Sequence, residues 1–398
     1  MQITDKIRIF AIVMAGLYIH IPFCASRCIY CGFYSTTQLS QQDRYVDALC
    51  KEMELRPLNA AFSPLTSIYL GGGTPSQLSS PNLERLFLYI NKVYGINKVY
   101  GENLGDIEIT MECNPDDVTE ELAALLSRLP VNRVSMGAQT FSDKRLQLLR
   151  RRHHAQQVDE AVERLRKAGI ENISIDLMFG FPNETLLEWE HDLERALSLQ
   201  MEHISAYSLM YEEGTQLCLL KDQGLRAYTP ISDELSRQMY ELLKDRLEQA
   251  GYEHYEISNF ARRRTDGGSW RSRHNSSYWE GIPYIGIGAA AHSYQLNTRS
   301  WNVSDLNAYM RAIESGKLPS EEEVLDEDTR YNDLITTAMR TREGICIEQL
   351  SDKYRTYLLQ TASRSLQHGL LTIENSYLHL TREGLFVSDD VMSDLIYL

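Results

Sequence analysis

Three cysteines follow a predicted strand in the run Tyr18-Ile19-His20-Ile21-Pro22-Phe23-Cys24-Ala25-Ser26-Arg27-Cys28-Ile29-Tyr30-Cys31, where they take a C-x3-C-x2-C spacing. Seven cysteines scattered at random through the chain would produce that spacing with a probability of about 2 × 10⁻³. A structural zinc or a fully ligated iron–sulfur cluster takes four protein ligands, so three thiolates leave one position open. The spacing therefore predicts an iron–sulfur cluster with one iron open to another ligand. The alternative is a zinc ion completed by a distant residue such as His20.

Outward from this run, short apolar segments alternate with longer amphipathic ones. The predicted strands are residues 17–21, 67–70, 106–111, 131–136, 173–178 and 203–209, and the predicted helices between them are residues 43–55, 81–93, 119–129, 155–168 and 185–200. Such βαβ repetition indicates parallel strands joined by right-handed crossovers. Six strands are too few for a closed eight-stranded barrel, so we expect an α/β fold with an incomplete barrel or an open sheet. In either architecture the functional groups gather at the carboxyl ends of the strands.

The pattern changes after a helical stretch at residues 232–250. Residues 252–257 and 284–287 are predicted strands, and the chain becomes acidic and helical from about residue 304. A hairpin at 371–373 and 377–380 then follows, which is typical of a small winged-helix-like module. We therefore expect a core at residues 14–235, a connecting segment at 236–303 and a C-terminal domain at 304–398. Met14 would also serve as a start, which marks residues 1–13 as a candidate upstream extension.

Membrane and nucleic-acid functions are disfavoured by hydropathy and charge. The apolar residues 9–17 make up about half of the roughly 20 residues that a spanning helix needs. No small-residue cleavage site follows them, so they do not indicate a signal peptide. The 40 Lys and Arg against 55 Asp and Glu give a formal charge of −15, which argues against a protein that neutralises nucleic-acid phosphates. We expect a cytoplasmic protein that is neither an integral membrane protein nor a partner of nucleic acid.

Residues 18–31 resemble the cluster loop of radical S-adenosylmethionine (SAM) proteins. Within that superfamily, they resemble the branch that contains the oxygen-independent coproporphyrinogen III oxidases and the HemW-type heme chaperones. The resemblance extends from about Gly16 to the final helical module. It implies a partial (β/α)6 TIM-like barrel followed by a small C-terminal α+β domain of the HemN type. It also implies a [4Fe–4S] cluster on Cys24, Cys28 and Cys31, with SAM bound beside it and reduced by one electron at its sulfonium.

Glycines and polar side chains stand at the predicted carboxyl ends of the strands. The run Gly71-Gly72-Gly73-Thr74-Pro75 follows the second strand, while Glu112, Gln139 and Asp176 lie at or near the ends of the third, fourth and fifth. Alone, each would fit a plain turn or a helix cap. The resemblance implies that SAM contacts Tyr18, Tyr30, Gly72, Gly73, Thr74, Glu112, Gln139, Arg151, Asp176, Met210 and His292. Met210 and His292 depart from the oxidase residues at those positions.

Two features bear on the choice between oxidase and chaperone. The oxidases carry a further cysteine two residues beyond the third cluster ligand, where this chain has Phe33. The run His274-Asn275-Ser276-Ser277-Tyr278-Trp279 closely matches the HNxxYW motif of HemW-like proteins. Imidazole is a common axial ligand of heme iron, and Tyr and Trp offer flat faces for a porphyrin. The resemblance implies heme binding by His274 as ligand, supported by Asn275, Tyr278 and Trp279; a loop histidine beside core aromatics is the alternative.

The resemblance therefore implies a heme chaperone that binds a [4Fe–4S] cluster and SAM, carries heme as cargo and transfers it to apo-hemoproteins, which we expect among components of the respiratory chain. The alternative is an enzyme, oxygen-independent coproporphyrinogen III dehydrogenase, which oxidatively decarboxylates two propionates to vinyl groups. A third interpretation, a radical SAM enzyme acting on tRNA, fits poorly with the charge of −15 and a sequence without an appended basic module. The sequence leaves open whether SAM is turned over.

Overall fold

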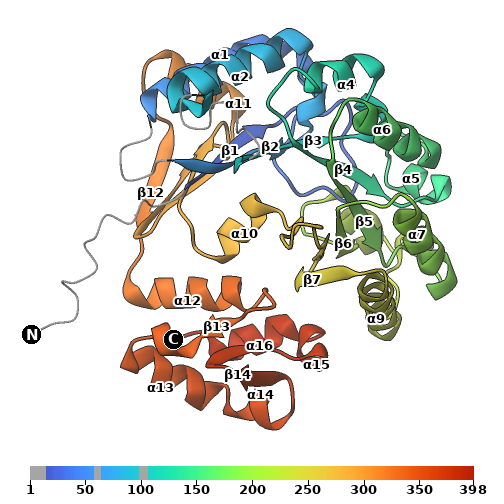
Figure 1. The fold of residues 1–398 in the computed structure, drawn as a ribbon, viewed down its shortest axis with the longest axis vertical. Coiled ribbons are helices and arrows are strands. Elements are labelled where there is room, and N and C mark those ends of the chain that lie inside the picture. Colours follow the sequence, from blue (N-terminus) through green and yellow to red (C-terminus); the bar gives the residue numbers. More distant parts are fainter. Residues whose placement is uncertain (1–14, 58–63, 98–105) are drawn as a thin grey trace, which may run out of the picture.

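The parallel strands predicted from the sequence form the centre of one curved, open sheet (Figure 1). The computed structural model describes residues 15–57, 64–97 and 106–398, so the candidate extension at residues 1–13 and Met14 lie outside the described residues. The central strands are β1 (Ala15–Ile21), β2 (Leu65–Gly72), β3 (Glu108–Cys113), β4 (Arg133–Gln139), β5 (Asn172–Phe179) and β6 (His203–Ser208). They pair in chain order and in parallel, which confirms the predicted incomplete barrel.

Six further strands extend the sheet at both edges. The order is β12-β11-β10-β9-β1-β2-β3-β4-β5-β6-β8-β7, in which β9 is parallel to β1 and β8 is antiparallel to β6. The added strands are β7 (Tyr252–Glu256), β8 (Asn259–Arg262), β9 (Tyr284–Ile287), β10 (His292–Gln295), β11 (Thr298–Asn302) and β12 (Ser320–Val324). The connecting segment is therefore part of the sheet.

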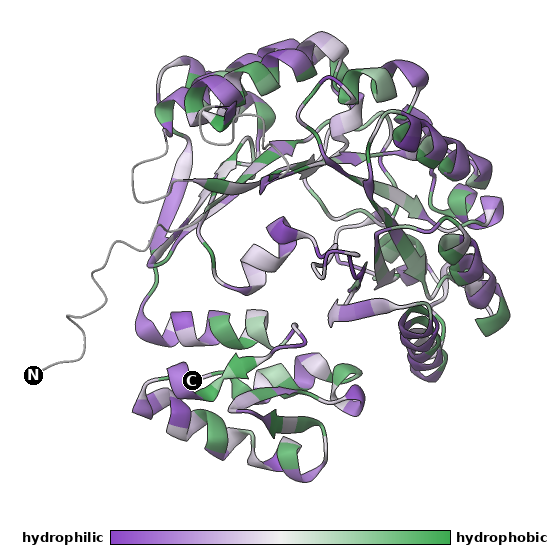
Figure 2. Cartoon of the chain, in the orientation of Figure 1, coloured by the Kyte–Doolittle hydropathy of each residue, from purple (hydrophilic) through white to green (hydrophobic). Residues whose placement is uncertain are grey.

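Helices cover the outer face of the sheet, with their hydrophilic residues turned to the outside (Figure 2). These helices are α1 (Gln42–Leu55), α2 (Ser80–Tyr94), α4 (Glu120–Leu126), α5 (Asp143–Leu148), α6 (Ala155–Lys167), α7 (Leu186–Ser198), α9 (Asp233–Gln249) and α11 (Leu306–Glu314). Leu17 and Ile19 of β1 are buried in the hydrophobic core with these helices, whereas Tyr18 and His20 alternate with them. Because side chains alternate along a strand, the inner face of the sheet is polar.

The inner polar side chains hydrogen-bond to one another across neighbouring strands. The Tyr69 hydroxyl donates to Glu112 Oε1 at 2.8 Å, and Ser174 Oγ lies 2.7 Å from His203 Nδ1. The short helix α10 (Arg273–Trp279) lies on this inner side of the curved sheet (Figure 1). Buried polar groups need partners, so the inner face is stable only when it is cross-linked or covered in this way.

A smaller α+β domain lies below the open side of the sheet (Figure 1). Its sheet has the order β13-β15-β14, which confirms the predicted hairpin and small module. Its elements are α12 (Glu327–Ala338), β13 (Ile345–Cys346), α13 (Asp352–Thr361), α14 (Ser363–Gln367), β14 (Leu371–Glu374), β15 (Tyr377–Leu380), α15 (Arg382–Leu385) and α16 (Ser388–Leu395). The main-chain N–H groups of Ile257 and Arg342 donate to the carbonyls of Arg340 and Tyr255 at 3.0 Å each, which ties this domain to the β7 edge.

The expected domain boundary at residue 304 lies too early. Leu306, Tyr309 and Ile313 of α11 are buried in the larger hydrophobic core, and β12 pairs with β11. The second hydrophobic core begins at Tyr331. The acidic and helical composition after residue 304 indicated a new domain at that point. It did not reveal that α11 packs its apolar face against the sheet and exposes only its polar face.

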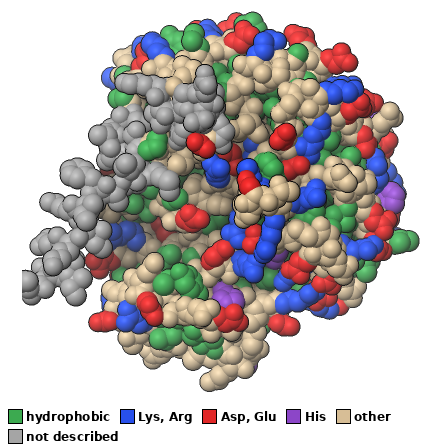
Figure 3. Space-filling view, viewed as in Figure 1, with side chains coloured by type: hydrophobic (Ala, Val, Ile, Leu, Met, Phe, Trp, Pro, Cys, Tyr) green, Lys and Arg blue, Asp and Glu red, His purple; other side chains and the backbone are tan. Residues whose placement is uncertain are grey.

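Charge and hydropathy on the surface are mixed. Acidic and basic side chains are interspersed over the face seen in Figure 3. Of the helices in the described part of the chain, none has the length and apolar character that crossing a bilayer requires.

A buried carboxylate on α1 joins the added strands to the parallel centre. Glu52 is fully buried and accepts hydrogen bonds from the Tyr309 hydroxyl at 2.5 Å, Asn302 Nδ2 at 2.7 Å and the Gly288 N–H at 2.8 Å. Arg56 Nε lies 3.0 Å from Glu52 Oε1. One side chain thus bonds to α11, to β11 and to the loop that follows β9.

We expect Glu52→Ala to lower the free energy of unfolding by about 3–5 kcal/mol, because it leaves several buried donors without an acceptor. The matched control is Glu54→Ala on the same helix, where an exposed ion pair with Lys92 predicts a loss of at most about 1 kcal/mol. Urea denaturation of both variants checks the difference. Equal losses would contradict a central role for Glu52.

Candidate functional site

The three cysteines of the predicted cluster lie in the loop that follows β1, at the carboxyl end of the parallel strands. Cys24 Sγ accepts a hydrogen bond from Thr74 Oγ1 at 3.3 Å, and Cys28 Sγ accepts one from Arg151 Nη1 at 3.6 Å. Burial, and to a lesser degree the neighbouring thiols, raise the pKa of Cys24 and Cys31 above the usual value. Without a bound metal these thiols are protonated, and a metal would have to stabilise their thiolates.

The zinc alternative lacks a ligand set in this structure. Within residues 15–57, 64–97 and 106–398, no three His, Cys, Asp or Glu side chains are close enough to hold a single metal ion. His20 does not join the cysteines, because its Nδ1 bonds to the Tyr18 hydroxyl at 2.9 Å and its Nε2 to the Tyr34 carbonyl at 3.0 Å. The described structure therefore gives no support to His20 as a fourth zinc ligand.

The glycine-rich turn after β2 packs directly against the end of β1. Gly72 has φ +110°, and a Cβ there would overlap the His20 ring. A Cβ at Gly73 would lie 2.6 Å from the Pro22 carbonyl carbon, and the Gly73 N–H already donates to the Ile21 carbonyl at 2.8 Å. The glycines are therefore required by the close approach of two chain segments, and Thr74 is thereby placed on Cys24.

Arg151 links the cysteine loop to the ends of β3 and β4. Its Nη2 donates to Asn114 Oδ1 and to the Gly137 carbonyl, both at 2.7 Å. A Cβ added at Gly137 would lie 3.1 Å from Arg151 Nη2 and 2.7 Å from Gln139 Nε2, so both side chains lie beside Gly137. Gln139 ends β4 with φ +67°. The Arg151 Nε is buried and has no hydrogen-bond partner among the described residues. A buried guanidinium with an unused N–H is ready to receive a carboxylate.

Two buried carboxyl groups lie on the inner face beside this cation. Burial raises the pKa of Glu112 to about 7 and the pKa of Asp176 to about 6. Glu112 Oε2 accepts the Gly72 N–H at 3.1 Å, and Asp176 Oδ1 accepts the Ser135 hydroxyl at 3.4 Å. Near neutral pH each carboxyl group can therefore be protonated or ionised. In either form it can hydrogen-bond to a hydroxyl or amine group of a ligand.

Of the remaining residues predicted to contact SAM, Tyr30 lies in the cysteine loop, whereas Met210 and His292 do not contact it. Tyr30 is part-buried near Cys28, Arg151 and Asp176, which act on its pKa electrostatically. Met210 follows β6 and is 59% exposed. His292 is exposed on β10 with its ring 6.1 Å from that of Trp301. Neither Met210 nor His292 contacts the cysteine loop or Arg151 through a hydrogen bond or ring contact in the described structure.

Sequence reasoning missed some residues of the inner face. Asn114 holds Arg151, and its place directly after β3 is the signal that could have identified it. Arg133 is 1% exposed, and its buried Nε has no hydrogen-bond partner among the described residues. Its charge lowers the pKa of both Glu112 and Asp176, against the larger effect of burial. Arg133 begins a strand, so its sequence position resembles an ordinary exposed strand end.

The HNxxYW run forms the helix α10, and it lies at the opposite end of the strands from the cysteines. Glu108, the first residue of β3, accepts the N–H groups of Arg273 and His274 at 3.0 and 3.1 Å. His274 is 1% exposed, and its ring stacks on Tyr69 with centroids 5.1 Å apart. A carboxylate at a helix N-terminus is favourable, so Glu108 fixes α10 inside the sheet.

The structure places His274, the predicted heme ligand, inside the sheet. The residue lies in a buried helix, and both ring nitrogens are engaged: Nδ1 lies 2.8 Å from Ser67 Oγ and Nε2 lies 2.8 Å from the Tyr278 hydroxyl. Tyr278 also packs edge-on against Tyr284 at 4.6 Å, and Asn275 and Trp279 are part-buried on the same helix. The motif thus packs as part of the barrel interior, and heme binding by His274, Asn275, Tyr278 and Trp279 stays a prediction.

Comparison with known proteins agrees with this architecture. Residues 18–196 match the radical SAM superfamily, and residues 325–387 match the HemN C-terminal domain. The chain is 36% identical to the heme chaperone HemW of Bacillus subtilis over 385 residues, which cover 95% of this chain and 98% of that protein. It is 32% identical to the heme chaperone HemW of Mycobacterium tuberculosis H37Rv over 386 residues, covering 96% and 94% of the two chains.

A solved structure shares the fold. Coproporphyrinogen III oxidase (HemN) from Escherichia coli, described as a radical SAM enzyme, superposes with a TM-score of 0.78 at 20% identity. The match covers 97% of this chain and 92% of that one, so it includes both the open sheet and the small C-terminal domain.

The burial of His274 predicts a pH-dependent stability. Burial lowers its pKa to about 3, whereas the unfolded chain takes up the proton near pH 6.5. Below pH 6.5 the unfolded state binds more protons, so this side chain costs the folded state about 1.4 kcal/mol per pH unit. The excess stability of wild type over His274→Gln should therefore be largest above pH 6.5 and decrease as the pH falls toward 4.5.

Denaturant titrations at several pH values measure this excess. His368→Gln, at an exposed position in the C-terminal domain, is the matched histidine control outside the sheet. A pH-independent excess for His274→Gln would show that the imidazole is accessible to protons in the folded state.

Proposed function

The chain belongs to the HemW family of the radical SAM superfamily, and from that premise we propose that it is a heme chaperone that binds a [4Fe–4S] cluster and SAM. In this proposal it carries heme and transfers it to apo-hemoproteins, including components of the respiratory chain. The named relatives are heme chaperones at 32–36% identity over nearly their whole length. The single observation in the fold that carries the cofactor proposal is the meeting of the cysteine loop with Thr74 and the partly unpaired Arg151.

The residues at the carboxyl end of the strands fit the two cofactors. We assign the cluster to Cys24, Cys28 and Cys31, and the SAM carboxylate to Arg151, whose buried Nε has a free N–H. Glu112, Gln139 and Asp176, together with the turn Gly72-Gly73-Thr74 and the rings of Tyr18 and Tyr30, would hold the rest of SAM. When bound, the cluster and SAM supply one-electron chemistry. The protein orients them and excludes water through the buried inner face.

The chaperone is favoured over the dehydrogenase by the cysteine loop itself. Phe33 stands where the resemblance places a further cysteine in the oxidases, and it is 72% exposed. An exposed aromatic side chain two residues beyond Cys31 suits contact with a partner or with cargo more than it suits a redox function. The shared fold with HemN does not distinguish the two activities, since one fold supports many functions.

The decisive experiment is anaerobic reconstitution of the full chain with iron and sulfide, followed by two parallel assays. We expect the protein to bind heme and transfer it to an apo-hemoprotein, and we expect no conversion of coproporphyrinogen III to protoporphyrinogen. A variant with Cys24, Cys28 and Cys31 all changed to Ala should lose the cluster absorbance. Robust decarboxylation in the presence of SAM would overturn the proposal in favour of the dehydrogenase.

The role of Arg151 gives a second prediction. Arg151→Gln should weaken SAM binding by about tenfold to a hundredfold, because a charge-assisted hydrogen bond to a carboxylate contributes about 1.5–3 kcal/mol. Equilibrium dialysis of SAM against the reconstituted protein measures the change. The neighbouring Arg150→Gln is the control, since Arg150 bonds to Gln216 on the surface at 2.8 Å. Equal SAM affinity in wild type and Arg151→Gln would remove Arg151 from the site.

A further inference from the structure

Arg133, the first residue of β4, is a buried cation on the inner face of the sheet. The residue is 1% exposed, and its Nε has no hydrogen-bond partner among the described residues. Val134 and Met136 of the same strand are buried in the hydrophobic core, so by alternation Arg133 faces the polar interior. A guanidinium removed from water destabilises the folded state unless nearby negative charge compensates it. The position of Arg133 therefore depends on the carboxyl groups around it.

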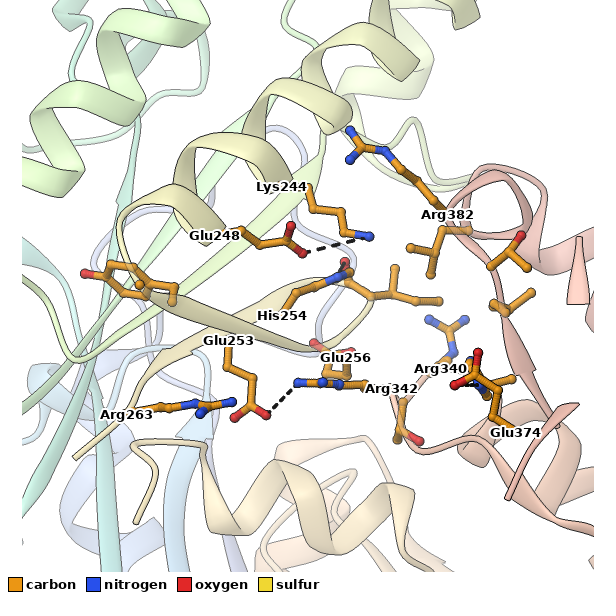
Figure 4. A pocket seen from close by; sticks show the side chains of 18 residues that line it. Lys244, Glu248, Glu253, His254, Glu256, Arg263, Arg340, Arg342, Glu374 and Arg382 are labelled. Carbon is orange, nitrogen blue, oxygen red and sulfur yellow. Dashed lines mark hydrogen bonds and ion pairs between the residues drawn. The ribbon is translucent and has the colours of Figure 1, made fainter. Parts of the chain in front are cut away.

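Exposed cations of this fold are compensated by an adjacent carboxylate, as Arg342 illustrates. Arg342 Nη1 lies 3.0 Å from Glu253 Oε1 in the cleft that β7 and the C-terminal domain line (Figure 4). The charge of Arg133 acts instead on two carboxyl groups at once, those of Glu112 and Asp176, and lowers the pKa of each. Both belong to the set of side chains that would hold SAM. Arg133 thus connects the interior of the sheet to the cofactor site.

The strand register places Arg133 between the two carboxyl groups. Ser135, the next inner residue of β4, lies opposite Glu112 of β3, and its hydroxyl donates to Asp176 Oδ1 of β5 at 3.4 Å. Arg133 lies on the same face two residues earlier, and its register partner on β3, Thr110, offers a hydroxyl but no charge. The strands on either side of Arg133 therefore each carry one carboxyl group, and both groups lie toward the end of the sheet that carries the cysteine loop.

Burial and Arg133 act on these carboxyl groups in opposite directions. Burial has the larger effect, which leaves the pKa of Glu112 at about 7 and the pKa of Asp176 at about 6. Asp176 receives a smaller effect of the same sign from Arg151. Because both values lie near neutral pH, the loss of one nearby positive charge is enough to decide whether each group holds a proton.

The other titratable groups around the two carboxyl groups do not change charge near neutral pH. Burial raises the pKa of the surrounding tyrosines and lowers the pKa of the histidines, so both kinds stay neutral. They are Tyr18 of β1, Tyr30 of the cysteine loop, Tyr69 of β2, His203 and Tyr207 of β6, and His274 and Tyr278 of α10. Glu108, on the same face of β3, is held by the main-chain N–H groups of α10. Among the described residues, Arg133 thus supplies the positive charge that acts on both carboxyl groups.

We propose that Arg133 is a positioning residue of the SAM site, where its positive charge stabilises the carboxylate forms of Glu112 and Asp176 that bind SAM. The inference rests on the proposed function for the identity of the ligand. SAM carries a sulfonium, an ammonium group and ribose hydroxyls, and a carboxylate is a stronger partner for each of these than a neutral carboxyl group. Arg133 acts through the two carboxylates and needs no contact with SAM. Its role in binding accounts for the cost of burying it.

The test measures SAM affinity of the reconstituted full-length protein as a function of pH, by equilibrium dialysis without reductant so that SAM stays intact. In wild type the affinity should fall as the pH decreases through about 7 and 6, where the carboxylates take up protons. Without the positive charge both pKa values rise, so in Arg133→Gln and Arg133→Met the same fall should begin about one pH unit higher. Arg133→Lys keeps the charge and should restore the wild-type profile. The titration of SAM itself is common to all variants.

Two controls accompany these variants. Arg128→Gln removes an exposed charge that lies 3.7 Å from Glu84, and its profile should match wild type. The double variant Glu112→Gln, Asp176→Asn should bind SAM more weakly and lose the fall in affinity below about pH 7. Persistence of that fall in the double variant would overturn the inference even where the neutral Arg133 variants do not fold. Circular dichroism establishes which variants are folded.

The outcomes separate this inference from the proposed function. A loss of affinity that is equal at every pH and remains in Arg133→Lys would show a purely structural role and overturn the inference. An unshifted profile in the neutral Arg133 variants would do the same, while SAM binding by wild type leaves the proposed function standing. Wild-type protein that binds no SAM at any pH would overturn the SAM part of the proposed function and this inference with it.

Discussion

The structure depends on the need to satisfy a polar inner face on a sheet that does not close. The buried outer residues of the strands pack under helices, but the inner residues include carboxylates, histidines and Arg133 that water would otherwise have to solvate. Near the amino ends of the strands, Glu108 and Ser67 bind α10 and its histidine. Near the carboxyl ends, Arg151 retains a buried N–H without a partner among the described residues. The same constraint thus produces a sealed end and a receptive end.

This division places the two sequence motifs at different ends of the strands. The cysteine loop belongs to the receptive end, while the HNxxYW helix belongs to the sealed end. Stacking of His274 on Tyr69 connects the motif to the carboxyl Glu112 through the Tyr69 hydroxyl, so the helix influences the SAM pocket only through the inner face. In this fold the motif also completes the interior of the barrel.

The repeating units and the cysteine spacing were predictable because they depend on local pattern. Alternation of short apolar and long amphipathic segments located each central strand within a few residues, and the spacing of Cys24, Cys28 and Cys31 located the loop. The burial of α10 was not predictable, since Glu108 and His274 lie 166 positions apart and their contact depends on the tertiary fold. The boundary at residue 304 was missed for a related reason: β10, β11 and β12 are short strands whose weak periodicity resembles that of loops.

Because α10 hydrogen-bonds to Glu108 on β3, the residues before α10 do not make a complete folding unit without it. A helix of this length is not stable alone in water, so α10 forms only when β3 is already in place to receive it. Conversely, a chain ending after α9 would leave Glu108, Ser67 and Tyr69 facing an unfilled interior. The barrel therefore acquires its native stability only after residues far downstream have been synthesised, and a truncated core would be a poor substitute for the whole protein in any study of cofactor binding.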